Sequence, residues 1–180
     1  MTLHARTKAF AKDHALTSWW HILSTTALLA TAVACTLPFA PLWVRVPCSV
    51  LSALLLVRLF VIYHDQQHRA ILPKSKLAEI YMKLFGICAL CPSTVWRSTH
   101  DDHHAHNCQL RVENIGSFPI MTKERFQNSS GSDRFKYLAM RHPLTLVLGY
   151  LTVFFYSMSL VPALTSPRRY WDAWLAVLVH

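Results

Sequence analysis

Acidic residues are scarce in this 180-residue chain, where nine Asp and Glu stand against eighteen Lys and Arg and give a formal net charge of +9 at pH 7. Charged residues make up only 15% of the chain, glycine occurs four times, and 53% of the residues are hydrophobic. This composition excludes an intrinsically disordered chain, collagen and a coiled coil. The five cysteines are odd in number and do not suggest an extracellular disulfide framework, so we expect reduced thiols.

Long apolar runs dominate the sequence. Residues 19–37 and 144–163 carry no Lys, Arg, Asp or Glu, and residues 43–63 carry only Arg45 and Arg58. Each run has close to the twenty residues that a helix needs to span the hydrocarbon of a bilayer. We therefore expect three transmembrane helices, the first two joined as a hairpin. A signal peptide is the alternative for the first run, because basic residues precede it.

A fourth apolar run begins at Trp171 and reaches the last residue, His180. Ten helical residues rise only about 15 Å, which is too little to cross a hydrocarbon layer of about 30 Å. We expect residues 1–180 to be the N-terminal part of a single all-α membrane domain with an incomplete C-terminus.

The distribution of positive charge predicts the orientation. Eleven Lys and Arg lie between the second and third runs, whereas the connection between the first two runs has at most Arg45. Basic loops stay in the cytoplasm, so the long central loop is expected there. Leu77–Val95 is apolar, but Glu79 and Lys83 favour a helix that lies in the interface or dips partway into the membrane. Topology explains the basic excess without a nucleic-acid partner, and no base-reading motif is present.

Five of the eleven histidines fall into two groups with helical spacing. His64 and His68 stand four residues apart in HDQQH, and HDDHH contains His100, His103 and His104. Residues three and four apart share one helix face, so each group can direct its imidazoles at a common point, and neutral imidazole binds iron, zinc or copper. The neighbouring acids Asp65, Asp101 and Asp102 either accept the other imidazole N–H and set the tautomer, or serve as ordinary acids at solvated helix starts.

Other metal motifs are missing. The chain has three glutamates and none is followed by His three residues later, so the Glu-x-x-His pairs of soluble di-iron proteins are absent. HExxH, the motif of zinc proteases, is absent as well. A centre bound almost wholly by histidine at a membrane surface is the remaining interpretation.

The stretches HDQQH and WRSTHDDHHAHN resemble the first two histidine boxes, HxxxH and HxxHH, of the membrane fatty acid desaturases. In that family the boxes follow transmembrane hairpins on the cytoplasmic side and hold two irons. The resemblance covers most of the chain after residue 40 and is sharpest from Tyr63 to about Phe126. It implies that the five box histidines are iron ligands, and Trp96, Arg97 and Asn107 match recurring neighbours.

The family's chemistry is an O2-dependent desaturation of a fatty acyl chain at two non-haem irons. The spacing of the first box is more similar to that of acyl-lipid enzymes than to that of acyl-CoA enzymes, which implies a lipid-linked substrate. Electrons come from a separate carrier, and a cytoplasmic basic surface suits an acidic ferredoxin or a cytochrome b5-type donor. The location implied is the bacterial inner membrane, with the histidine boxes facing the cytoplasm. Asn107 is expected, with the acids, beside the metal ligands.

The chain departs from the family at two places. Gln67 stands where many members have Gly, and a third HxxHH box is absent from the 180 residues, so this segment alone is expected to be inactive. Two other functions fit the same histidines. One is a related membrane hydroxylase or ketolase, and the other is a non-catalytic, histidine-rich metal-binding membrane protein.

Overall fold

The computed structural model describes residues 12–106 and 120–180, and these residues form helices and no strand. The all-α expectation is therefore confirmed. The chain divides into two compact units, Met1–Met82 and Lys83–His180. In chain order the helices are α2 (Ala15–Ala34), α3 (Leu42–Gln67), α4 (Lys76–Cys88), α5 (Ser93–Ala105), α6 (Lys123–Asn128), α7 (Gly131–Ala139), α8 (Pro143–Val147), the π-helix η2 (Tyr150–Leu160), α9 (Val161–Thr165) and α10 (Trp171–Val179).

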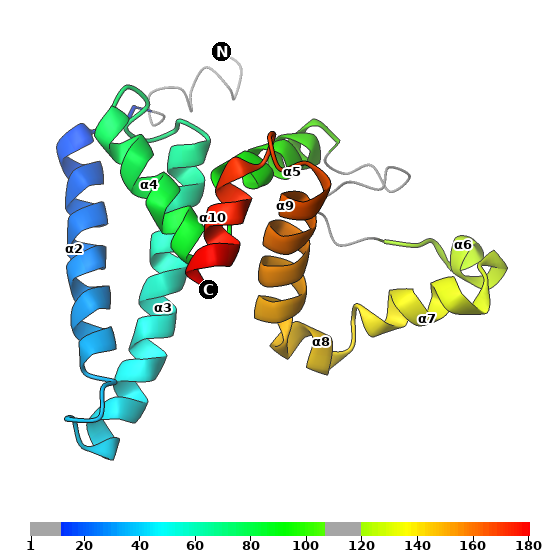
Figure 1. The fold of residues 1–180 in the computed structure, drawn as a ribbon, viewed down its shortest axis with the longest axis horizontal. Helices are drawn as coiled ribbons and strands as arrows, with labels where there is room; N and C mark the ends of the chain where they lie inside the picture. The colour runs from blue at the N-terminus through cyan, green and yellow to red at the C-terminus, as the bar shows by residue number, and fades with distance from the viewer. Residues whose placement is uncertain (1–11, 107–119) are drawn as a thin grey trace, which may run out of the picture. The chain divides into compact units, whose positions relative to one another are not determined.

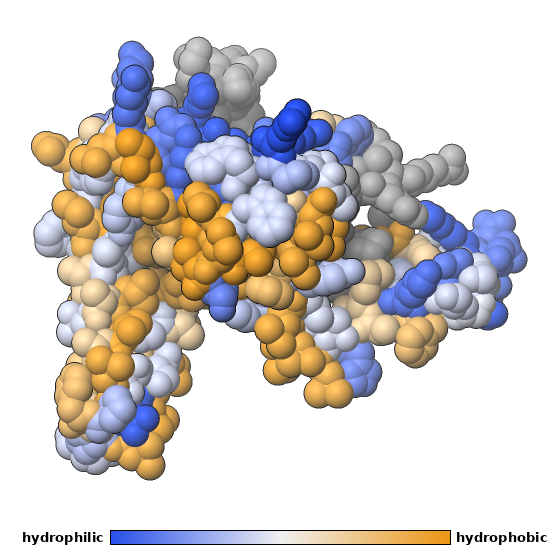
Figure 2. Space-filling view, viewed as in Figure 1, coloured by the Kyte–Doolittle hydropathy of each residue, from blue (hydrophilic) through white to orange (hydrophobic). Residues whose placement is uncertain are grey.

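The first unit is built on the α2–α3 hairpin, in which the two helices lie side by side (Figure 1). The seam between them is narrow, with Ile22, Leu55 and Leu59 among the few buried side chains. Many other apolar side chains are exposed, including Leu54 and Val57, which are 64% and 62% exposed, and hydrophobic residues are interspersed with more polar ones on the face of the hairpin that Figure 2 shows. A water-soluble protein rarely exposes so much apolar surface, so this surface fits contact with lipid.

Helix α3 is the only described helix that is by itself long and apolar enough to cross a membrane. It contains the predicted 43–63 run and extends to Gln67. In its most apolar stretch only 17% of the residues are buried within the protein, unlike the core helix of a soluble domain. Helix α2 overlaps the predicted 19–37 run over most of its length, but its Ser and Thr residues lower its hydropathy.

Polar contacts hold the ends of the first unit together. The Asp13 carboxylate accepts hydrogen bonds from Ser18 Oγ at 2.7 Å and from the Leu72 backbone N–H at 2.8 Å, which joins the start of α2 to the loop after α3. The hydroxyl groups of Thr26 and Tyr81 lie 2.6 Å apart and join α2 to α4. These hydrogen bonds contribute to the stability of the first unit, in which little apolar surface is buried within the protein.

Helix α3 ends in a sharp turn immediately after its second box histidine. Arg69 adopts a left-handed backbone conformation, with φ 57°, and the Ala70 N–H donates to the carbonyl oxygen of Asp65 at 2.9 Å. The Arg69 N–H donates to the Gln66 carbonyl oxygen, and the two bonds together form a Schellman C-cap. The left-handed conformation costs a residue other than glycine about 1–2 kcal/mol, so the surrounding structure must enforce it.

The apolar run 77–95 is divided into α4 and the beginning of α5, which meet at an angle of 93°. Helix α4 ends in a second Schellman cap, where Leu90 is left-handed with φ 54° and the Cys91 N–H donates to the Gly86 carbonyl oxygen at 2.8 Å. The bend prevents α4 and α5 from forming one straight span. Together they have the length and hydropathy of a broken span or a re-entrant segment.

The third apolar run forms a broken helix in place of a straight one. It starts at Pro143, where the His142 side chain caps the first turn, and continues through α8, η2 and α9. Within η2 the Ser157 and Ser159 hydroxyls donate to carbonyl oxygens five residues earlier, at 2.9 and 3.0 Å. These bonds match the wider π-helical repeat, which is rare over eleven residues.

The second unit contains two small apolar clusters. Ile87, Leu90 and Ala176 pack with Phe154 and Phe155 in one cluster. Val95, Ala163 and Ala173 form the other, against Met158 and Tyr170. Ser159 Oγ also donates to the carbonyl oxygen of Leu90, across the first cluster. The contacts join the end of α4, from Lys83 onward, to α5, η2, α9 and α10 within the second unit.

A buried carboxylate fastens α10 to the start of α5. Asp172 is 2% exposed, and its carboxylate accepts hydrogen bonds from the Thr94 backbone N–H at 3.0 Å and from the Thr94 hydroxyl. Thr94 lies in the first turn of α5, where the backbone N–H groups have no partner within the helix and a negative charge is favoured. Nothing in the sequence pattern predicts this role for Asp172, although an acid at the start of an apolar run indicates an unusual environment.

We predict that Asp172→Ala lowers the free energy of unfolding of the second unit by about 1.5–3 kcal/mol, because the variant leaves the Thr94 N–H and hydroxyl without their charged acceptor. Thermal unfolding in detergent measures this effect. Asp133→Ala is the matched control, because Asp133 is exposed on α7 and should change stability by only about 0.5 kcal/mol. Equal losses in the two variants would contradict the structural role of Asp172.

Candidate metal centre

The first histidine group lies in the last turn of α3. His64 and His68 are four residues apart, and their ring centroids are 4.6 Å apart with the rings inclined at 69°. Their ligand nitrogens lie within 4.8 Å of each other. The sequence spacing therefore places both rings on one face of the helix, as expected, and the left-handed turn at Arg69 follows directly.

Asp65 sets the tautomer of His64. The Nδ1 of His64 lies 3.0 Å from the Asp65 carboxylate. In the neutral ring, the Nδ1–H group therefore donates a hydrogen bond to Asp65, and Nε2 carries the lone pair. A metal-binding histidine commonly donates its other ring N–H to a carboxylate in this way, which orients the ring and raises its basicity. Asp65 thus makes the contact that sequence analysis anticipated for a neighbouring acid.

The second histidine group lies near the end of α5 and repeats the geometry of the first. His100 and His104 have ring centroids 4.6 Å apart with the rings inclined at 75°, and their Nε2 atoms are 3.0 Å apart. Two ligand nitrogens at about 2.1 Å from one metal ion and about 90° apart would be separated by about 3.0 Å. The separation of the two Nε2 atoms therefore fits two ligands of a single transition-metal ion.

Trp96 supports the second pair. Its side chain is 5% exposed and stacks on the His100 ring, with centroids 4.1 Å apart and an interplanar angle of 25°. Because Trp96 is one turn before His100 on α5, the buried indole restricts the rotation of the imidazole. Trp96, which the sequence indicated only through the family resemblance, thus has a contact that positions the His100 ring.

His103 is placed differently from His100 and His104. Its ring centroid lies 5.9 and 5.8 Å from theirs, and its Nδ1 is buried with no hydrogen-bond partner among the described residues. A buried polar atom without a partner costs about 1–3 kcal/mol, which a bound ligand would relieve. The imidazole nitrogens of the two boxes and the unpartnered Nδ1 of His103 therefore both fit a metal site.

Asp101 and Asp102 are placed differently from Asp65. Asp102 contacts His106, with its Oδ1 3.3 Å from His106 Nδ1 and its carbonyl oxygen 3.0 Å from the same atom. Asp101 is exposed on α5. Asn107 lies outside the described residues. Asp65 contacts a box imidazole in a geometry that sets the tautomer of His64.

Comparison with known proteins gives a consistent result. The model of the family described as fatty acid desaturase matches residues 40–180. A fatty acid desaturase of Bacillus subtilis is 28% identical over 107 residues, which is 59% of this chain and 30% of that protein. An sn-1 oleoyl-lipid 12-desaturase of Synechocystis sp. is 31% identical over 84 residues, which is 47% of this chain and 23% of that protein. No solved structure gave a significant match.

We predict that Asp65→Ala weakens iron(II) binding by the full-length protein about 10- to 100-fold, because His64 loses the acceptor that sets its tautomer. A titration against a competing chelator measures the affinity. Asp101→Ala is the matched control, since it removes an exposed acid next to a box histidine and should leave the affinity unchanged. An unchanged affinity in Asp65→Ala would show that Asp65 does not orient a ligand.

Proposed function

Because the chain belongs to the fatty acid desaturase family, we propose that the full-length protein introduces a double bond into a lipid-linked fatty acyl chain. The observation that carries the proposal is the matched pair geometry at His64 and His68 and at His100 and His104, both within the family-matched region. The matched segments cover less than a third of either curated relative. The acyl-lipid substrate class follows the name of the Synechocystis relative, which is an oleoyl-lipid desaturase.

The metal centre that we propose contains two non-haem irons. Its ligands on this chain are His64 and His68 from the first box and His100, His103 and His104 from the second. Five imidazoles are fewer than two irons require, so water or further residues would complete the coordination. Two pairs with the same ring separation, each at the C-terminal end of a helix, support a paired centre over a single isolated site.

The proposed reaction removes hydrogen from unactivated methylene groups, which no side-chain acid or base achieves; two irons held by the histidines would supply the required oxidant from O2 and two electrons. The residues of the chain would orient the metal ligands and position the substrate. Asp65 holds the Nδ1 proton of His64, so that Nε2 presents its lone pair. Trp96 fixes the plane of His100. The apolar spans would hold the acyl chain so that one pair of carbons faces the centre.

An external electron carrier completes the proposal. The short helices α6 and α7 present exposed cationic side chains, namely Lys123, Arg125, Arg134 and Lys136. A surface of this charge favours docking of an acidic ferredoxin or a cytochrome b5-type donor. The charge distribution also supports a location in the bacterial inner membrane with the histidine boxes facing the cytoplasm.

We predict that His100→Ala, His103→Ala and His104→Ala each reduce desaturation at least about 100-fold, because each variant removes a proposed iron ligand. Gas chromatography of fatty acids from a host that expresses the full-length protein measures the product. His106→Ala and His142→Ala are the controls, because His106 contacts Asp102 and His142 caps α8. These two variants should retain most of the activity.

Three results would contradict the proposal. Near-normal amounts of unsaturated lipid in a box variant would remove that residue from the ligand set. An oxygen-dependent hydroxyl or keto product in place of a double bond would assign the same histidines to a hydroxylase or ketolase. Bound metal without any oxygen-dependent product would indicate a metal-binding protein.

A further inference from the structure

The end of the α2–α3 hairpin that is opposite to His64 carries two cysteines. Cys35 is the C-cap residue of α2, and Cys48 lies in the second turn of α3. Both side chains are partly buried, and their thiols form a hydrogen bond with each other. Cys48 precedes His64 by sixteen residues, or about 24 Å along the helix axis. The cysteine pair is therefore separate from the proposed metal centre.

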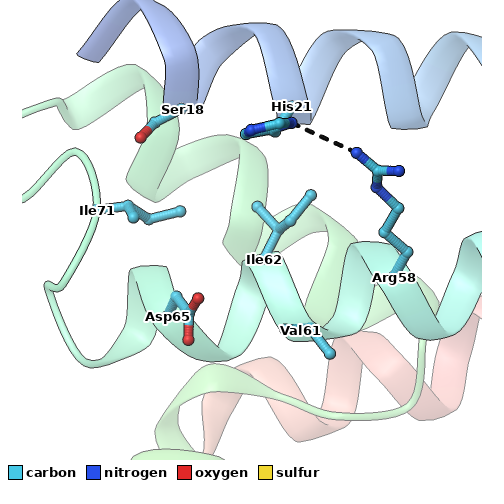
Figure 3. A pocket seen from close by; sticks show the side chains of 7 residues that line it. All are labelled: Ser18, His21, Arg58, Val61, Ile62, Asp65 and Ile71. Atoms are coloured by element: carbon cyan, nitrogen blue, oxygen red, sulfur yellow. Dashed lines mark hydrogen bonds between the residues drawn. The ribbon is translucent and has the colours of Figure 1, made fainter. Parts of the chain in front are cut away.

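The register of the two antiparallel helices places these cysteines opposite each other. Arg58 on α3 and His21 on α2 face each other in a pocket of the hairpin, with Arg58 Nη2 3.4 Å from His21 Nδ1 (Figure 3). Nearer the connection between the helices, Arg45 Nε donates to the carbonyl oxygen of Thr36 at 3.1 Å. The cysteines flank this second contact, one residue before it on α2 and three residues after it on α3. Residues three apart share a helix face, so both thiols lie on the sides of the helices that meet.

The connection between α2 and α3 is expected outside the cytoplasm. Residues 35–44 contain no Lys or Arg, whereas the loop between the second and third apolar runs is strongly basic. In the proposed inner-membrane orientation, the two thiols lie at the periplasmic end of the hairpin. Arg45 lies at the same end, where a long cationic side chain can reach the membrane interface. The periplasm is oxidising, so disulfides form and persist there.

We propose that Cys35 and Cys48 form a disulfide that joins α2 to α3 at the periplasmic end of the hairpin. The oxidant is the disulfide of a periplasmic thiol oxidoreductase. One cysteine thiolate attacks this disulfide, and the other cysteine then displaces the carrier from the mixed disulfide. The S–S bond of the hairpin forms, and the carrier accepts two electrons and two protons to become a dithiol. The sequence predicted reduced thiols from the odd number of cysteines, and the proposal departs from that prediction for this pair alone.

The disulfide stabilises the hairpin where packing between the helices is limited. Few side chains are buried along the seam of α2 and α3, among them Leu55 and Leu59. The crosslink closes a loop of fourteen residues and removes conformations from the unfolded chain. It also fixes the register of α3, whose other end carries the first histidine pair. The proposal rests on the proposed orientation and not on desaturation, so its test measures linkage and stability.

Peptide mapping of the full-length protein tests the linkage. Cells are denatured in N-ethylmaleimide, which blocks thiols before air oxidises them, and the protein is digested with trypsin without reductant. Cleavage after Lys and Arg places the two cysteines in separate peptides, 13–45 and 46–58. These peptides should stay joined, with a mass two hydrogens below their sum, until reductant is added. Peptide 84–97 is the internal control, because the exposed Cys88 and the buried Cys91 should both be alkylated.

Thermal unfolding in detergent tests the effect of the crosslink. Cys48→Ser should lower the midpoint by at least about 5 °C, because the unfolded chain regains the freedom that the disulfide removed. Reductant should lower the wild-type midpoint by a similar amount and leave that of Cys48→Ser unchanged, which separates loss of the crosslink from the substitution itself. Cys88→Ser is the matched control and should keep the wild-type midpoint, because Cys88 is exposed in the second unit. A wild-type midpoint that reductant does not change would contradict the proposal.

Recovery of the two cysteines as separately alkylated peptides from the wild type would overturn the disulfide. The orientation is measured independently with Phe39→Cys in a Cys35→Ser, Cys48→Ser background, because Phe39 is 76% exposed in the connection. A membrane-impermeant maleimide should label this variant in intact spheroplasts. Labelling together with unlinked wild-type peptides would confine the failure to the disulfide, whereas labelling only after the membrane is opened would overturn the orientation and the disulfide together. Unsaturated lipid from the same cells reports the proposed desaturation separately from both results.

Discussion

The histidine pairs depend on one constraint, namely that each stands at the C-terminal end of a rigid helix. The i, i+4 spacing brings the two rings of a pair to the same face, and the helix keeps their centroids 4.6 Å apart in both α3 and α5. The carbonyl groups at the end of a helix carry partial negative charge, which favours a cation there. Position and spacing thus both suit a bound metal ion, and a loop would supply neither with the same precision.

Several of the nine acidic residues of the chain have a carboxylate with a defined partner. Asp13 and Asp172 accept backbone N–H and hydroxyl groups and join segments that are distant in the sequence. Asp65 and Asp102 accept imidazole N–H groups. Burying a carboxylate away from water is costly unless hydrogen bonds compensate for the lost hydration. This cost explains both why acidic residues are few in the chain and why the buried ones have hydrogen-bond donors as neighbours.

Two sharp turns direct the helices that carry or precede the histidines. Arg69 follows the first pair, and Leu90 lies between α4 and α5, both in the left-handed conformation. Neither residue is glycine, so hydrogen bonds and packing must offset the strain. Leu90 is fully buried, packs in the cluster of Ile87 and Ala176, and its carbonyl oxygen accepts from Ser159. The apolar core of the second unit thereby sets the bend of 93° from which α5 departs.

The sequence by itself determined the features that depend on local spacing. Apolar runs of span length located α2, α3 and the helix that starts at Pro143, and the spacing of HDQQH and HDDHH predicted the ring pairs of His64 with His68 and of His100 with His104, because helical periodicity is a local property. Only the tertiary structure bent the 77–95 run and placed Asp172 at the first turn of α5. Those outcomes depend on contacts between residues far apart in the chain, for which a periodic pattern contains no signal.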